Sequence, residues 1–241
     1  MSFAPALRAE LIKIRTLRPL LWGLAAVLAA TVVFSALAGL DDSSAPDFDP
    51  LFTTFFGVTF GQIAAITFGT QAVSAEYQGG ALRLSLAAVP HRGRWFLAKT
   101  VAIGVPALGT GLVTGVAGLV AGRSVLGSRA EGLTWAEEVR GVVGCSVYLA
   151  LMALFAAGLT AVLRSGVATL SILTPFLLIV SFVVGGASGT VADFLPDQAG
   201  QMVLRETADG VLGPWSGLAV TALWTAAALG AGAWCVRRRD V

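Results

Sequence analysis

The strongest constraint on the fold is a series of six apolar stretches separated by more polar segments. A helix rises about 1.5 Å per residue, so about 20 apolar residues cross the hydrocarbon core of a bilayer, which is about 30 Å thick. The expected spans are residues 20–40, 51–75, 96–122, 139–163, 167–187 and 215–236. The chain is 56% hydrophobic and only 12% charged, whereas soluble domains are about 25% charged. The sequence therefore predicts an all-α integral membrane protein with six transmembrane helices in a single domain, residues 1–241.

Two capping signals agree with these boundaries. Asp49 precedes Pro50, and an aspartate followed by a proline is typical of the start of a helix. Thr134 is followed three residues later by Glu137, which is the spacing of a capping box. These signals place helix starts close to where hydropathy places the second and fourth spans.

The basic residues divide unequally between the two sides of the predicted bundle. If both termini are cytoplasmic, twelve basic residues face the cytoplasm and four face the opposite side. The twelve are Arg8, Lys13, Arg15, Arg18, Arg83, Arg92, Arg94, Lys99, Arg164, Arg237, Arg238 and Arg239. The four are Arg123, Arg129, Arg140 and Arg205. Because cytoplasmic loops carry an excess of Lys and Arg, we expect a multi-pass protein of the plasma membrane with both termini in the cytoplasm.

The segment before the first span is basic and amphipathic over residues 6–17. We expect it to form a helix that lies in the inner membrane interface. The alternative is a cleaved signal peptide, because Arg15 and Arg18 precede an apolar run that ends in Ala36-Leu37-Ala38. Residues 20–38 exceed the usual apolar core of a signal peptide, about 7–15 residues, so we favour a retained first span.

Ionisable residues are missing from the middle of every predicted span. Such residues mark ion pathways in membrane proteins, so we expect no proton or sodium relay within this chain. A polar stripe nevertheless covers roughly a third of the circumference of the second predicted helix. Its members are Thr59, Thr67, Thr70, Gln71 and Ser74. The stripe fits hydrogen bonding to neighbouring helices, which we favour, or one wall of a translocation path.

Glycines recur at a spacing of four residues in several spans, as in Gly57-x-x-x-Gly61 and Gly111-x-x-x-Gly115. This spacing lets helix backbones approach closely. The close contact can lie within one chain or between two chains, and the sequence leaves both interpretations open.

Motifs for catalysis and nucleotide binding are missing from the sequence. The nearest approach to a phosphate-binding loop, residues 93–100, has Ala98 where the second glycine is required. His91 is the only histidine, so neither a histidine-pair metal site nor a Ser-His-Asp triad can form. The formal net charge of +2 is too small to indicate a nucleic-acid partner. We expect no cofactor or metal bound by this chain and no enzymatic activity of its own.

The segment between the second and third spans holds the densest mixture of charged, aromatic and apolar side chains. Leu82, Leu86 and Val89 fall at i, i+4 and i+7, on one face of a short helix that Pro90 would end. Such a helix suits the membrane surface or a groove in a partner protein.

This segment resembles a loop of the membrane permease subunit of type-2 ABC exporters. That family has an acidic residue, then a glycine with leucines, then a proline with a basic residue, and a lysine as the next span begins. The matching positions here are Glu76, Gly80, Leu82, Leu86, Pro90, Arg92 and Lys99. Ala81 departs from the family, in which threonine is frequent after the glycine. The resemblance implies a coupling helix within residues 76–94 that docks on a separate cytosolic ATPase, with Arg83 as a further contact.

The resemblance extends to the whole chain. The six predicted spans, the N-terminal amphipathic helix and the long outer segment, residues 186–214, are similar to that family, which has a short outer helical hairpin before the last span. Phe194, Leu195, Met202 and Leu204 would then dip into the outer interface. The resemblance implies that the chain pairs with a second copy of itself or a related permease, while ATP and Mg²⁺ bind to the partner ATPase.

These features together predict a permease subunit of an ATP-driven exporter. Because the spans carry few charges, the expected cargo is amphipathic or lipid-like. Drug export with multidrug or antibiotic resistance, self-protection against a peptide, and lipid export all remain open. The alternative is a membrane anchor or sensor subunit that recruits a cytoplasmic partner without moving cargo. An intramembrane lipid enzyme is disfavoured, because the spans offer no buried acid, histidine or nucleophile paired with a base.

Overall fold

The computed structural model describes residues 3–40, 48–88, 91–130, 132–180, 183, 192–206 and 211–238. Helices are the only regular structure in these residues, so the predicted all-α class is confirmed for them. Five helical segments have the length and apolar composition of membrane spans. They are Arg18–Gly39, Pro50–Tyr77, Arg92–Leu126, Trp135–Leu163 and Pro214–Arg238. These five segments indicate a multi-pass membrane protein.

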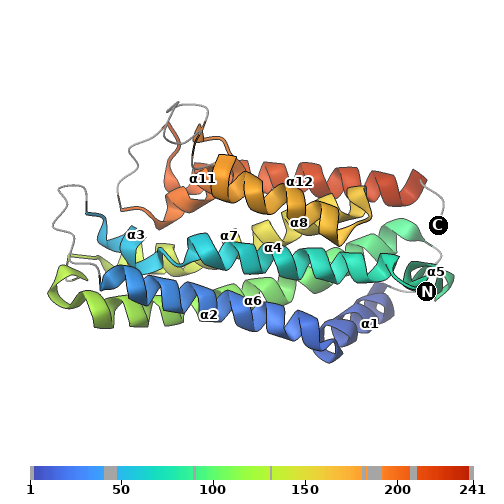
Figure 1. Cartoon of the computed structure of the whole chain (residues 1–241), viewed down its shortest axis with the longest axis horizontal. Helices are drawn as coiled ribbons and strands as arrows, with labels where there is room; N and C mark the ends of the chain where they lie inside the picture. The colour runs from blue at the N-terminus through green and yellow to red at the C-terminus, as the bar shows by residue number, and fades with distance from the viewer. Residues whose placement is uncertain are drawn as a thin grey trace.

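The long helices run side by side along one axis (Figure 1). They are α2 (Arg18–Gly39), α4 (Val58–Ser74), α6 (Arg92–Leu126), α7 (Trp135–Leu163) and α12 (Pro214–Arg238). At one end of the bundle lie α1 (Phe3–Thr16), α5 (Ala81–Ala88) and the last turn of α12 (Figure 1). Toward the other end lie α3 (Pro50–Phe55) and α11 (Pro196–Gln201). We call these the α1 end and the α3 end.

The second predicted span is divided into α3 and α4 by a turn at Gly57. Asp49 caps α3 as the sequence predicts, since its side chain accepts a hydrogen bond from the backbone N–H of Phe52 at 2.8 Å. At the division, the Gly57 N–H donates to Ser35 Oγ of α2 at 3.0 Å. A Cβ on Gly57 would lie 1.9 Å from the carbonyl oxygen of Thr31, so only glycine allows α2 to come this close.

The fifth predicted span, residues 167–187, is described only in part. Its first portion forms α8 (Gly166–Pro175) and the π-helical turn η3 (Phe176–Val180). Pro175 has no backbone N–H to donate, and the helical hydrogen bonding changes at the next residue. The apolar helix Gly166–Ile179 is shorter than the five candidate spans. Residues 181–182 and 184–187 of the prediction lie outside the described residues.

Helix α7 lies at the centre of the bundle, in contact with α4, α6 and α12. Glycines bring the neighbouring backbones close to it. A Cβ on Gly69 of α4 would lie 2.0 Å from the carbonyl oxygen of Ala153, and one on Gly111 of α6 would lie 2.8 Å from Ser146 Cα. Gly111 therefore packs within the chain, which is one of the two interpretations that the sequence leaves open.

Part of the predicted outer segment packs into the bundle. Helix α11 and the 3₁₀ turn η4 (Met202–Leu204) contact α7 and α12. Met202 and Leu204 are 9% and 1% exposed, because they are buried among these helices. This corrects the expectation that they dip into the outer membrane interface. Phe194, in contrast, is 44% exposed. Residues 186–191 and 207–210 of the expected hairpin lie outside the described residues.

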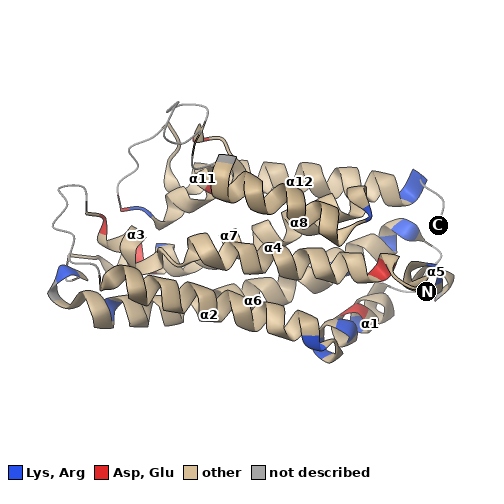
Figure 2. Cartoon of the chain, in the orientation of Figure 1, with Lys and Arg blue, Asp and Glu red and all other residues tan. Residues whose placement is uncertain are grey.

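Charged side chains gather toward the two ends of the bundle (Figure 2). The α1 end carries basic residues of α1, α5, α6 and α12. At the α3 end, Arg123 pairs with Glu138 at 2.9 Å, and Arg140 Nη2 donates to the carbonyl oxygen of Arg205 at 2.7 Å. Arg239, which the sequence assigns to the cytoplasmic side, lies outside the described residues.

Candidate functional site

The α1 end holds a cluster of four ionisable side chains. They are Glu10 and Lys13 of α1, Glu76 of the 3₁₀ turn η1 (Ala75–Tyr77), and Lys99 of α6. Lys99 Nζ lies 2.6 Å from Glu76 Oε1 and also contacts Glu10 Oε2. Lys13 Nζ lies 2.8 Å from the same Glu76 oxygen and 2.9 Å from Glu10 Oε1. This charge cluster therefore joins α1, the end of α4 and the first turns of α6.

The charge cluster is balanced, because two carboxylates face two ammonium groups. Glu10, Glu76 and Lys99 are each no more than 4% exposed, and an unpaired charge at that burial would be strongly unfavourable. Burial alone would lower the pKa of Lys13, but its hydrogen bonds to Glu76 and Glu10 outweigh burial and raise the pKa. The folded chain therefore favours the charged form of Lys13, and the loss of any one member leaves another without a full set of partners.

Ser85 connects the charge cluster to α5. Its hydroxyl donates to Glu76 Oε2 at 3.0 Å and accepts from Lys13 Nζ at 3.2 Å. The chain turns from η1 into α5 at Gly79 and Gly80, whose φ angles of 60° and 76° lie in the left-handed region that favours glycine. Ser85 therefore links α5 to Glu76, which in turn contacts α1 and α6.

Helix α5 lies where the sequence predicts a short helix, but its apolar face has a different role from the one expected. Leu82 is 4% exposed and Leu86 is half-buried, and both pack against the core of the bundle. This corrects the expectation that the leucine face meets the membrane or a partner. Leu84, which is 75% exposed, and Arg83 form the free surface of α5. Val89 and Pro90 lie outside the described residues.

Arg92 lies apart from the charge cluster. Its Nη1 donates to the carbonyl oxygen of Val236 at 3.2 Å, which ties the start of α6 to the end of α12. The predicted coupling loop is therefore divided between two contacts, one centred on Glu76 and the other on Arg92.

A pocket of about 370 Å³ lies beside Glu76 and is lined partly by Gly80 and Arg83. Arg164, which sequence reasoning did not select, also lines this pocket. It ends α7 with a φ of 56°, and its guanidinium lies over the Tyr77 ring at 6.0 Å from the centroid. The connection from α7 to α8 thus contributes a cation to the same surface as α5.

Three residues of the predicted polar stripe lie together. Thr70, Gln71 and Ser74 line an open pocket of about 350 Å³ between α4 and the start of α8. Thr70 Oγ1 and Gln71 Oε1 have no hydrogen-bond partner among the described residues, although both atoms are buried. Unmatched polar atoms at a pocket are suited to bind water or a polar group.

The other two residues of the stripe, Thr59 and Thr67, do not line this pocket. Thr67 donates to a backbone carbonyl of its own helix at 2.8 Å. Thr59 donates to Gln201 Oε1 at 3.2 Å, Gln201 Nε2 donates to Tyr148 Oη at 3.3 Å, and the Tyr148 hydroxyl donates to Gln62 Oε1. This polar network joins α4, α7 and α11. Three of the five stripe residues therefore line one pocket, and Thr59 belongs to a separate polar network.

Sequence reasoning missed several members of these two sites. Glu10, Lys13, Tyr148 and Gln201 carried no motif, and apart from the pair Glu10 and Lys13 their partners are far away in the sequence. Lys13 and Glu76, for example, are separated by 63 positions. Tertiary packing brings Glu10 and Lys13 to Glu76, and Gln201 to Tyr148, so no local pattern identifies these sites.

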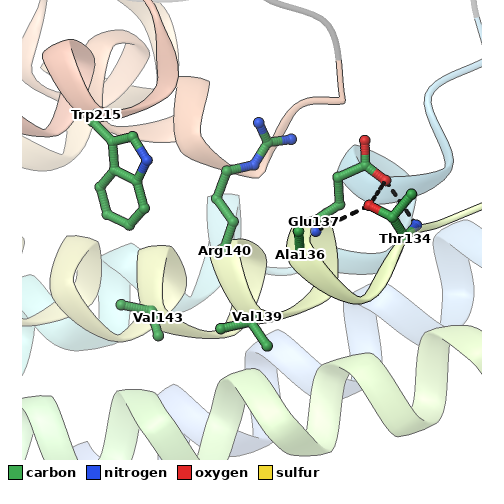
Figure 3. Close-up of a pocket in the computed structure, with 7 residues that line it drawn as sticks. All are labelled: Thr134, Ala136, Glu137, Val139, Arg140, Val143 and Trp215. Atoms are coloured by element: carbon green, nitrogen blue, oxygen red, sulfur yellow. Dashed lines mark hydrogen bonds between the residues drawn. The ribbon is translucent and has the colours of Figure 1, made fainter.

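A further pocket, of about 420 Å³, opens at the α3 end between α7 and α12 (Figure 3). Figure 3 shows Trp215 and Arg140 at its wall. Thr134 and Glu137 form the predicted capping box there, with the Thr134 N–H donating to Glu137 Oε2 at 2.8 Å. Because Arg140 holds the Arg205 carbonyl and Glu137 holds the helix cap, we assign a structural role to these residues.

Among the described residues, no group of three or more His, Cys, Asp or Glu side chains is placed to hold a metal ion. No protein-family model matches the chain, and comparison with curated proteins finds no significant match. Fold and site define a helical membrane protein with a buried charge cluster beneath one exposed helix.

Proposed function

We propose that this chain is the transmembrane permease subunit of an ATP-driven exporter similar to the type-2 ABC family, located in the plasma membrane. In this proposal six spans cross the bilayer, and α8 with η3 begins the fifth. The α1 end faces the cytoplasm because it carries most of the Lys and Arg residues. The chain pairs with a second copy of itself or a related permease, and an amphipathic or lipid-like cargo crosses between them.

One observation supports the proposal above all: the exposed helix α5 is connected through Ser85 and Glu76 to helices of the bundle. Breaking the buried ion pair of Glu76 and Lys99 is strongly unfavourable, and the hydrogen bond from Ser85 joins α5 to that pair. A partner that pushes on α5 would therefore move the base of α4 and the start of α6 rather than a loose loop. Rigid helices then carry the displacement toward the α3 end.

The free surface of α5 is the proposed docking site for a separate cytosolic ATPase, which binds ATP and Mg²⁺. Arg83 and the exposed Leu84 supply a charge and an apolar contact, and Arg164 adds a second cation beside them. The pocket of Thr70, Gln71 and Ser74 adjoins this surface, since Tyr77 and Arg164 line both it and the pocket beside Glu76. We assign this pocket to the lower part of the translocation path.

The proposal is tested first by capture of the partner. A photo-crosslinking amino acid replaces Leu84 in the full chain, and the protein that it captures is purified and assayed for ATP hydrolysis with the reconstituted chain. The expected result is a cytosolic ATPase whose turnover depends on this chain. The variant Arg83→Ala/Leu84→Ala should abolish that dependence, whereas Ile12→Ala, an exposed apolar position on α1, should preserve it.

Glu76→Gln tests the connection rather than the docking. It leaves the surface of α5 intact, so the ATPase should still bind while its turnover no longer responds to cargo. If the captured protein lacks ATPase activity and no ATP turnover responds to the chain, the permease proposal fails. A captured regulatory protein would instead support an anchor or sensor subunit.

A further inference from the structure

A pocket of about 510 Å³ opens at the α1 end, between the start of α6 and the end of α12. It is lined by His91, Arg92, Gly93, Arg94, Leu97 and Arg237. Three of these six residues are arginines, and none of the six has a carboxylate. Figure 2 shows Lys and Arg colour on both helices in this region. The pocket is a concentrated positive surface.

Two contacts build this basic pocket. Arg92 Nη1 donates to the Val236 carbonyl at 3.2 Å and holds the two helix ends together. Arg237 lies against Gly93, where a Cβ would come within 2.8 Å of its Nη2, so the glycine makes room for the guanidinium. Arg94 and Arg237 are exposed, and neither takes part in an ion pair within the described ranges. An anion between them would offset the repulsion of their like charges.

The surroundings of the basic pocket are those of a membrane interface. Leu97 in its wall is 54% exposed, and Trp234, one turn before the end of α12, is 56% exposed. The Arg238 guanidinium lies over the Trp234 ring at 5.2 Å from the centroid. Exposed tryptophan beside arginine at the end of a span is typical of the depth at which lipid phosphates lie.

We propose that the basic pocket binds the phosphate group of an anionic phospholipid, with Arg94 and Arg237 as its ligands and an acyl chain along Leu97. Basic pockets between membrane helices recognise anionic headgroups through such charge pairing. A phosphate free in solution would satisfy the arginines but leave Leu97 uncovered, so a lipid fits the pocket better. The inference does not depend on transport, because an anchor or sensor subunit with this pocket would bind the same lipid.

The test uses native mass spectrometry of the detergent-purified full chain with dioleoyl phosphatidylglycerol or dioleoyl phosphatidylcholine. The wild type should retain the anionic lipid preferentially, and Arg94→Gln/Arg237→Gln should lower that retention about tenfold. The control Arg8→Gln/Arg15→Gln removes the same charge from exposed positions of α1, at the same end, and should leave retention unchanged. Arg94→Lys/Arg237→Lys changes the same two positions but keeps their charge, so it should retain most of the anionic lipid. This variant keeps the test decisive if the glutamine variant fails to fold.

Three results would overturn the inference. The first is equal retention of the two lipids by the wild type. The second is an equal loss in the α1 control, which would mean that net charge rather than the pocket attracts the lipid. The third is full displacement of phosphatidylglycerol by equimolar glycerol 3-phosphate, which would indicate a site for soluble phosphates.

Discussion

Lys99 Nζ lies 2.6 Å from Glu76 Oε1, with both side chains at most 5% exposed. The two residues belong to different helical segments, so their contact fixes the end of α4 against the start of α6. Helix α1 completes the arrangement with Glu10 and Lys13, which supply the second carboxylate and the second ammonium group. The amphipathic N-terminal helix is therefore attached to the bundle by buried charge as well as by its apolar residues.

Glu76→Gln should destabilise the folded chain by about 3 kcal/mol, because it leaves two ammonium groups with one carboxylate in a buried site. The measurement is the free energy of unfolding in mixed detergent micelles. Glu206→Gln, the same change at an exposed position, should have little effect. The double variant Glu76→Gln/Lys99→Gln restores charge balance, so it should cost less than the two single variants added together. If the losses of unfolding free energy in the two single variants simply add in the double variant, the two side chains are not coupled and the assignment is wrong.

The charge cluster should also make stability depend on pH in the alkaline range. The pKa of Lys13 is raised in the folded chain above its usual value of 10.5. Its contribution to stability is therefore complete below pH 10.5 and is lost as the pH rises through the folded pKa. The measurement is the midpoint temperature of thermal unfolding between about pH 9.5 and about pH 11.5, a range centred on that value. With rising pH this midpoint should fall more steeply in the wild type than in Lys13→Met. Parallel curves for the two proteins would contradict the assignment.

A matched pair of glycines tests the close packing of α4 on α7. Gly69→Ala should destabilise the chain by about 2 kcal/mol, because its Cβ would lie 2.0 Å from the Ala153 carbonyl oxygen. Gly230→Ala makes the same change on α12, where the described residues place no atom within 4 Å of the new Cβ. Alanine has the higher helix propensity, so the second variant should be neutral or more stable by up to about 1 kcal/mol. Unfolding of both variants in detergent gives the comparison.

Hydropathy predicted the long helices well, because each helix that crosses the hydrocarbon core needs its own continuous run of apolar residues. The first expected span, residues 20–40, corresponds to α2 at Arg18–Gly39, and the last, residues 215–236, corresponds to α12 at Pro214–Arg238. The third was predicted too short, because α6 continues beyond the apolar run into polar residues at both ends. The division at Gly57 was missed, since it depends on how closely α2 approaches.

The candidate sites were harder to predict than the helices. Glu76 and Gly80 were selected through a resemblance in one loop, and Gly80 indeed makes a turn that favours glycine. Glu10 was not selected, because a carboxylate on an amphipathic helix is usually solvated and nothing local shows that it is buried. The leucine face of α5 was identified, but the contact of Leu82 was predicted wrongly. The period of a helix identifies an apolar face and not what that face packs against.

Tyr148 lies at the centre of the polar network that joins α4, α7 and α11. The hydroxyl donates to Gln62 Oε1 and accepts from Gln201 Nε2, and both Tyr148 and Gln62 are no more than 1% exposed. Tyr148→Phe leaves these amide groups without their partner, so it should cost about 1 to 3 kcal/mol of unfolding free energy. Adding Gln62→Leu replaces the buried acceptor by an apolar side chain, and the double variant should recover part of the loss. Tyr77→Phe is the comparison variant, because the Tyr77 hydroxyl donates to a backbone carbonyl at the longer distance of 3.4 Å, so its loss should cost less unfolding free energy. If the double variant is less stable than Tyr148→Phe alone, the cost arises from packing rather than from the unpaired amide.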